Sequence, residues 1–124
     1  MSVLPNTAAT SHIYTGDRFR LMKNSAIFIN CGRGNAVSAD VLYKALSEGQ
    51  IAAAGIDVAE TEPLPEDSPL WSLENLMITP HISGSHHLPE TVDRIVDICA
   101  ENLQAFLNGG KLKNVVDIST GYKT

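Results

Sequence analysis

Apolar and polar positions follow two kinds of pattern along this chain. Three short apolar runs, at 26–30, 51–58 and 76–79, have the length and composition of buried β-strands. Apolar residues recur at three- and four-residue spacing over 38–49 and 89–108, which predicts two amphipathic helices. The run at 26–30 is apolar almost throughout rather than alternating, so we expect parallel strands and a first strand that is fully buried.

Capping residues set the limits of the two long helices. Ser38 is a good N-cap for the first helix, and Gly49 is the glycine expected after its last turn. Pro89 suits the first turn of the second helix. This helix is expected to end at Gly109 and Gly110.

Two further elements are short. A helix is predicted to start at 15–17, with Phe19, Leu21 and Met22 on its buried side, and 114–117 reads as a last strand. The order of elements is an α/β pattern with parallel strands and right-handed crossovers. Three parallel strands make a poor free-standing sheet, because such sheets need neighbouring strands and cover on both faces.

The composition is that of an ordinary soluble globular protein, with 44% hydrophobic and 19% charged residues among 124. A net charge of −5 and scattered Lys and Arg residues disfavour a nucleic-acid-binding surface. No apolar run approaches the length of a membrane-spanning helix. Residues 1–6 lack the features of a signal peptide. We interpret Cys31 and Cys99 as reduced thiols of a cytoplasmic protein. The adjacent His86 and His87 have no third ligand at a suitable spacing, so no metal site is expected.

Functional side chains follow the three predicted strands. Arg33 comes just after the first strand, Asp57 ends the second, and His81 comes just after the third. Ligands bind at the carboxyl ends of parallel strands, and these ends meet at one edge of the sheet. An arginine, a carboxylate and a histidine brought together there form an acid/base site for a carboxylate substrate.

Each of these residues also has a structural explanation. Arg33 could form an ion pair from a loop, although its two glycine neighbours leave it little to pack against. His81 could simply end a strand, and Glu62 could be a solvated loop acid with Glu60 as a competitor for any role. Cys31 is better explained as a small hydrophobe than as a redox group. A Ser-His-Asp hydrolase is disfavoured, because no G-x-S-x-G motif occurs.

Seven short motifs occur in one order along the chain. They are Leu4-Pro5-Asn6-Thr7, Met22-Lys23-Asn24-Ser25-Ala26, Asn30-Cys31-Gly32-Arg33-Gly34, Gly55-Ile56-Asp57-Val58, Glu62-Pro63-Leu64-Pro65, Ser68-Pro69-Leu70-Trp71 and Thr79-Pro80-His81-Ile82-Ser83-Gly84. Together they closely resemble the C-terminal part of the D-isomer-specific 2-hydroxyacid dehydrogenases, over residues 4–117. That family includes phosphoglycerate, D-lactate, glyoxylate/hydroxypyruvate and formate dehydrogenases.

The resemblance implies a partial Rossmann-like α/β fold. Residues 1–86 would be the second half of the NAD(P)-binding domain, and residues 87–124 a long helix and the return segment of the substrate domain. The family's GxGxxG turn and its ribose-reading residue would lie upstream, so we expect a fragment that is inactive alone and whose choice between NAD and NADP is open. The implied partners are a small 2-hydroxy or 2-oxo acid, the missing N-terminal half and a second copy in a homodimer.

The resemblance also assigns site residues. Arg33 would hold the substrate carboxylate, and His81, paired with Glu62, would transfer the proton while hydride passes between C4 of the nicotinamide and C2 of the acid. Asp57 would bind the nicotinamide carboxamide. The cofactor-binding residues implied are Leu4, Pro5, Cys31, Gly32, Arg33, Asp57, His81, Ser83 and Gly84. The alternative is a truncated, non-catalytic remnant or a self-associating interaction domain, although the site residues are all intact.

Overall fold

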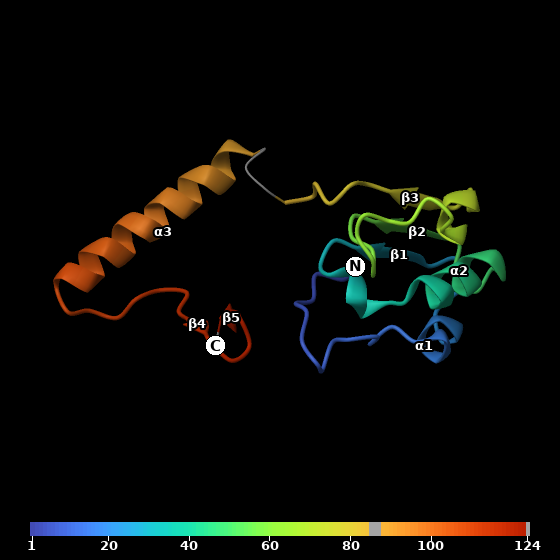
Figure 1. Ribbon diagram of the computed structural model, residues 1–124, viewed down its shortest axis with the longest axis horizontal. Coiled ribbons are helices and arrows are strands. Elements are labelled where there is room, and N and C mark those ends of the chain that lie inside the picture. The colour runs from blue at the N-terminus through green and yellow to red at the C-terminus, as the bar shows by residue number, and fades with distance from the viewer. Residues whose placement is uncertain (85–87, 124) are drawn as a thin grey trace. The chain divides into compact units, whose positions relative to one another are not determined.

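The computed structural model describes residues 1–84 and 88–123, which form two compact units divided between Ser83 and Gly84 (Figure 1). In the first unit the helices and strands are α1 (Gly16–Arg20), β1 (Ile27–Asn30), α2 (Ala39–Ser47), β2 (Ala53–Ile56) and β3 (Leu76–Ile78). Two 3-10 turns, Gly34–Ala36 and Pro69–Ser72, connect them. In the second unit the elements are α3 (Pro89–Leu107), β4 (Val116–Asp117) and β5 (Tyr122–Lys123).

The three strands of the first unit form a parallel sheet in the order β1-β2-β3, which confirms the predicted α/β fold. The register places Ile29 beside Gly55 and Gly55 beside Met77. The N-terminal residues add one further parallel bridge, because the Ser2 amide donates to the carbonyl of Ile29 (2.7 Å) and the Cys31 amide to that of Ser2 (3.0 Å).

The core lies on one face of this sheet, where α1 and α2 pack (Figure 1). Phe28 of β1 meets Phe19 of α1 edge to face, with ring centroids 5.2 Å apart, and Tyr14 meets Phe28 at 4.9 Å. Leu42 and Leu46 of α2 are buried in the same cluster. Each such side chain contributes about 2 kcal/mol by leaving water, so this layer fixes the sheet against the helices.

The prediction that the strand at 26–30 is fully buried is wrong. Ile27 of β1 is 65% exposed and Met77 of β3 is 70% exposed, on the face opposite the core. Within residues 1–83, α1 and α2 pack on one face of the sheet, and every second residue of β1 is exposed on the other face. Leu21 was also expected to be buried, but it is 87% exposed because α1 ends at Arg20 and Leu21 only caps it.

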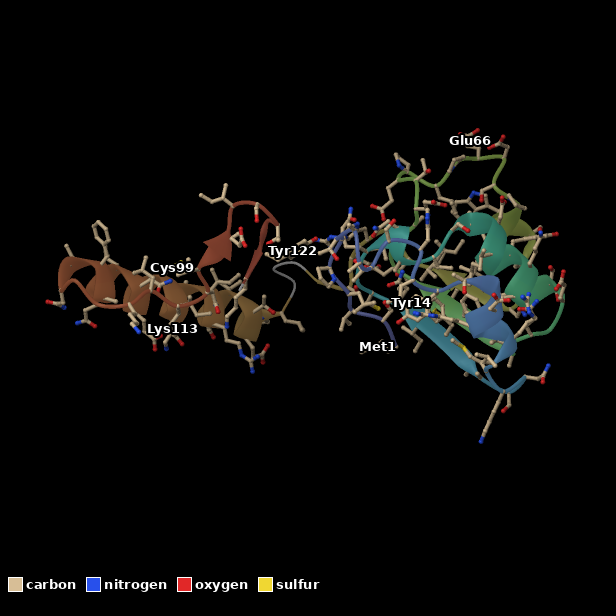
Figure 2. The ribbon with its side chains drawn as sticks, turned by 90° about the horizontal axis from the view of Figure 1, so that it is seen from below. Met1, Tyr14, Glu66, Cys99, Lys113 and Tyr122 are labelled. Atoms are coloured by element: carbon tan, nitrogen blue, oxygen red, sulfur yellow. The ribbon has the colours of Figure 1, made fainter. Side chains whose placement is uncertain are left out.

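The boundaries of α2 confirm the predicted capping. Ser38 Oγ accepts a hydrogen bond from the Val41 amide (3.4 Å), and α2 ends with Glu48 as its C-cap. Gly49 follows with a φ of +66°, a conformation that favours glycine. Residues 61–68 form a loop, and Figure 2 shows the exposed Glu66 projecting from it.

The second unit is a helix followed by a small hairpin. The predicted helix over 89–108 is confirmed as α3, and no residue of α3 is fully buried. Asn102 ties the following segment to α3 by exchanging two hydrogen bonds with the backbone of Lys113 (2.7 and 3.1 Å). The strand predicted at 114–117 is shorter, and its antiparallel partner β5 was missed. Within the described ranges, no helix has both the length and the apolar character that crossing a membrane requires.

Candidate functional site

The loop after β1 is shaped by a buried asparagine. Asn30 is fully buried, its Oδ1 accepts from the Gly32 amide (3.2 Å), and its Nδ2 donates to the carbonyl of Arg33 (3.1 Å). Arg33 itself is exposed, and its Nη1 donates to the carbonyl of Gly32 (3.0 Å). Among the described residues its guanidinium forms no ion pair, which leaves most of its donors open.

Two glycines let other backbone segments approach this loop. A Cβ on Gly34 would lie 1.8 Å from the carbonyl oxygen of Ala59, and a Cβ on Gly32 would lie 2.6 Å from the Leu4 nitrogen. The loop therefore packs backbone against backbone, both on the segment after β2 and on the N-terminal residues. Pro5 and Cys31 are half-buried beside this contact.

The predicted contact between His81 and Glu62 is present. Nδ1 of His81 lies 2.8 Å from Oε2 of Glu62, and Oε1 of Glu62 accepts from the Ala59 amide (2.9 Å). The hydrogen bond with His81 lowers the pKa of the Glu62 carboxyl, burial opposes this, and the Ala59 amide and the charges of His81 and Arg33 add to the lowering. His81 has a φ of +56° and a half-exposed side chain, so the pair can be reached from solvent.

Glu60, the competitor for Glu62, belongs to a different pair. Its Oε1 lies 2.6 Å from Nε2 of His12, and its Oε2 accepts from the Ala39 amide at the start of α2 (3.2 Å). Glu60 therefore ties the N-terminal loop to α2, and Glu62 is the acid that meets His81.

Asp57 is buried at the end of β2 and accepts four hydrogen bonds. Its Oδ1 accepts from Thr79 Oγ1 (2.5 Å) and the Ile82 amide (2.9 Å). Its Oδ2 accepts from the amide (2.8 Å) and Oγ (2.6 Å) of Ser83. Burial alone would raise the pKa of Asp57, but the hydrogen bonds from Ser83, Thr79 and Ile82 outweigh it and hold the pKa well below its ordinary value of 3.8. The carboxamide role of Asp57 stays a prediction.

A cavity of about 600 Å³ opens beside the Glu62–His81 pair. Its walls include Pro63, Trp71 and Pro80. The Trp71 indole donates to the carbonyl of Pro65 (2.8 Å), which fixes the ring at the edge of this cavity. A histidine that contacts a carboxylate beside a cavity, with an arginine nearby, can bind a small anion and exchange a proton with it.

The remaining predicted residues follow β3 along the chain. Ser83 and Gly84 are exposed, and Ser83 is held by Asp57. His86 and His87 lie outside the described residues. In the described ranges, no three metal-ligating side chains come close enough to hold an ion. Asn30, which shapes the Arg33 loop, was not predicted as a site residue. The sequence indicated its role only in that a polar residue ends an apolar run at this position.

Comparison with known proteins gives consistent matches. Residues 1–83 match the family model described as "D-isomer specific 2-hydroxyacid dehydrogenase, NAD binding domain". A glyoxylate reductase of Korarchaeum cryptofilum is 45% identical over 114 residues, which are 92% of this chain and 34% of that protein. A glyoxylate/hydroxypyruvate reductase B of Escherichia fergusonii is 45% identical over 115 residues, 93% of this chain and 35% of that protein. The chain thus spans about a third of the length of the curated relatives it matches.

Solved structures agree with these sequence matches. A D-isomer specific 2-hydroxyacid dehydrogenase from Xanthobacter autotrophicus, in complex with NADPH and MES, has a TM-score of 0.82 and 38% identity, covering 97% of this chain and 48% of that chain. An NADPH-dependent glyoxylate/hydroxypyruvate reductase from Sinorhizobium meliloti, in complex with NADP and sulfate, has a TM-score of 0.82 and 30% identity, covering 97% of this chain and 38% of that chain.

Proposed function

This chain belongs to the D-isomer-specific 2-hydroxyacid dehydrogenase family, and from that premise we propose that it carries part of the active site of an NAD(P)-dependent oxidoreductase. The reaction is the reduction of a small 2-oxo acid to the D-2-hydroxy acid, or its reverse. Glyoxylate and hydroxypyruvate are the first substrates to test, because relatives over 92–93% of the chain are reductases of these acids.

The observation that carries the proposal is the 2.8 Å contact between His81 and Glu62 beside an open cavity. Reduction of a 2-oxo acid requires a proton at the carbonyl oxygen, and an imidazole held in place by a carboxylate is suited to deliver it. Arg33 would bind the substrate carboxylate, because a guanidinium fork matches two carboxylate oxygens.

Bound NAD or NADP would supply the hydride from C4 of its nicotinamide. Leu4, Pro5 and Cys31 offer half-buried, mainly apolar surface at the sheet edge, which suits one side of a flat ring. We extend the proposal to Gly32, Arg33, Asp57, His81, Ser83 and Gly84 as further cofactor-binding residues. These 124 residues contain no GxGxxG motif, so we expect the chain alone to bind NADH more weakly than micromolar.

We assign residues 1–86 to the NAD(P)-binding domain and residues 87–124 to the segment that returns to the substrate domain. On this assignment the chain works together with an N-terminal half of the enzyme and has little activity without it. A homodimer and a cytoplasmic location also stay predictions of the family resemblance, and sedimentation of the purified chain checks the first.

A chimera tests the proposed function. The chain replaces the matching 114 residues of the Korarchaeum glyoxylate reductase, and NADH or NADPH oxidation is followed with glyoxylate and with hydroxypyruvate. We expect turnover that requires one of these acids. A folded chimera that binds the cofactor but turns over neither acid would contradict the proposal and favour a non-catalytic remnant.

A further inference from the structure

The four hydrogen bonds to Asp57 come from both sides of His81. Thr79 lies two residues before His81, Ile82 follows it directly, and Ser83 lies two residues after it. Their donors reach the two Asp57 oxygens at 2.5 to 2.9 Å. Asp57 thus holds the chain on either side of the histidine, while the histidine itself contacts Glu62.

We propose that Asp57 is a positioning residue that places His81 against Glu62 by fixing the segment 79–83 at the end of β2. The catalytic role of the His81–Glu62 pair rests on the proposed function. The positioning of His81 by Asp57 can be tested without measuring turnover. Asp57 acts on the histidine through the backbone and side chains of its neighbours.

The conformation of His81 explains why the segment needs such a contact. His81 has a φ of +56°, which a residue with a Cβ adopts only when its surroundings hold it there. The segment bends sharply at this point, because the His81 amide donates to the carbonyl of Thr79 (3.0 Å). The hydrogen bonds to Asp57 on both sides of the bend supply the restraint.

An ionised carboxylate suits this position better than an amide. Four donors, two backbone amides and two hydroxyls, meet two oxygens, and each carboxylate oxygen accepts two hydrogen bonds. Asparagine would keep one accepting oxygen and present an NH2 group to donors. Asp57 is 4% exposed, so the unmatched donors would have little water to bond instead.

The filled acceptor positions also bear on direct ligand binding by Asp57. A ligand amide could reach the carboxylate only by sharing or displacing a donor from segment 79–83. Of the two hydroxyl donors, Ser83 Oγ is the one on an exposed residue, whereas Thr79 is half-buried, so Ser83 Oγ is the hydroxyl that such a ligand would displace.

The test reads the pKa of Glu62, because contact with His81 lowers it. Carboxyl 13C NMR titrations are recorded on the whole chain without cofactor, for the wild type, Asp57→Asn, the double variant Thr79→Val with Ser83→Ala, and Asp67→Asn. Asp67→Asn is the matched control, since it makes the same change on an exposed loop residue. Amide shifts of β1 to β3 report whether the sheet is intact.

We expect the pKa of Glu62 to rise toward its ordinary value of 4.5 in Asp57→Asn and in the double variant, and to stay at the wild-type value in Asp67→Asn. A wild-type Glu62 titration in a folded Asp57→Asn chain would overturn the proposal. If Asp57→Asn does not fold, the double variant decides, because it removes only two hydroxyl donors. An inactive chimera would instead contradict the proposed function and leave this result standing.

Discussion

Oε2 of Glu62 lies 2.8 Å from Nδ1 of His81, nineteen residues further along the chain. The same loop supplies Glu60, whose carboxylate meets His12 and the first amide of α2. Two acids two residues apart therefore have separate partners. This separation allows the role of each acid to be tested by the same substitution.

Glu62→Gln should lower kcat of the chimera about 10- to 100-fold, because His81 loses the charged partner that orients it. Steady-state rates with glyoxylate and NADPH measure the effect. Glu60→Gln is the matched control and should leave kcat within about twofold, since its partners lie on the N-terminal loop and α2. Equal losses in both variants would argue against a specific role for Glu62.

Arg33→Ala should lower kcat/KM of the chimera about 10- to 100-fold, because a hydrogen bond to a charged group contributes about 1.5–3 kcal/mol and the variant loses it. Arg33→Lys should recover only part of this, because lysine keeps the charge but not the two-pronged fork. Arg18→Ala, at an exposed position of α1, serves as the control. An unchanged kcat/KM in Arg33→Ala would show that the substrate carboxylate binds elsewhere.

The stability of the chain should depend on pH through Asp57. An acid whose pKa is lower in the folded than in the unfolded chain stabilises the fold at pH values above its unfolded-state pKa, which is near 3.8 for Asp57. This stabilisation is lost progressively as the pH falls below that value. Asp57→Asn should therefore reduce the free energy of unfolding by about 2 kcal/mol at pH 7, with a shrinking difference below pH 3.8. Urea unfolding at several pH values measures this. A difference independent of pH would contradict the account.

Gly34→Ala should destabilise the first unit by about 1–3 kcal/mol or more, because the added Cβ would lie 1.8 Å from the Ala59 carbonyl oxygen. Gly55→Ala is the matched control, since nothing lies within 4 Å of its Cβ position. Chemical denaturation of both variants provides the comparison. If Gly34→Ala were as stable as Gly55→Ala, the close packing of the two loops would be disproved.

Local patterns in the sequence were sufficient to predict the main elements. The apolar runs located β1, β2 and β3, and Ser38 and Gly49 located the ends of α2, because strand burial and helix capping depend on neighbouring residues. The exposure of the sheet face with Ile27 and Met77 was not predictable. Burial of a sheet face depends on which other elements pack against it and not on the residues of the strand itself.

The hydrogen bonds of the candidate site were predictable only in part. Motif resemblance paired Glu62 with His81, and these two side chains are in contact in the structure. The buried Asn30 and the four donors around Asp57 depend on how the backbone turns after each strand, which residue spacing does not encode. The β4–β5 hairpin was missed although Asp117 and Gly121 are typical turn residues.

The most direct test of the central claim is the kcat for glyoxylate reduction by the chimera carrying His81→Asn. If His81 delivers the proton, kcat should fall about 10²- to 10⁴-fold while cofactor binding persists. A kcat within a few-fold of the unsubstituted chimera would show that the proton comes from another group, and it would contradict the assignment of the His81–Glu62 pair.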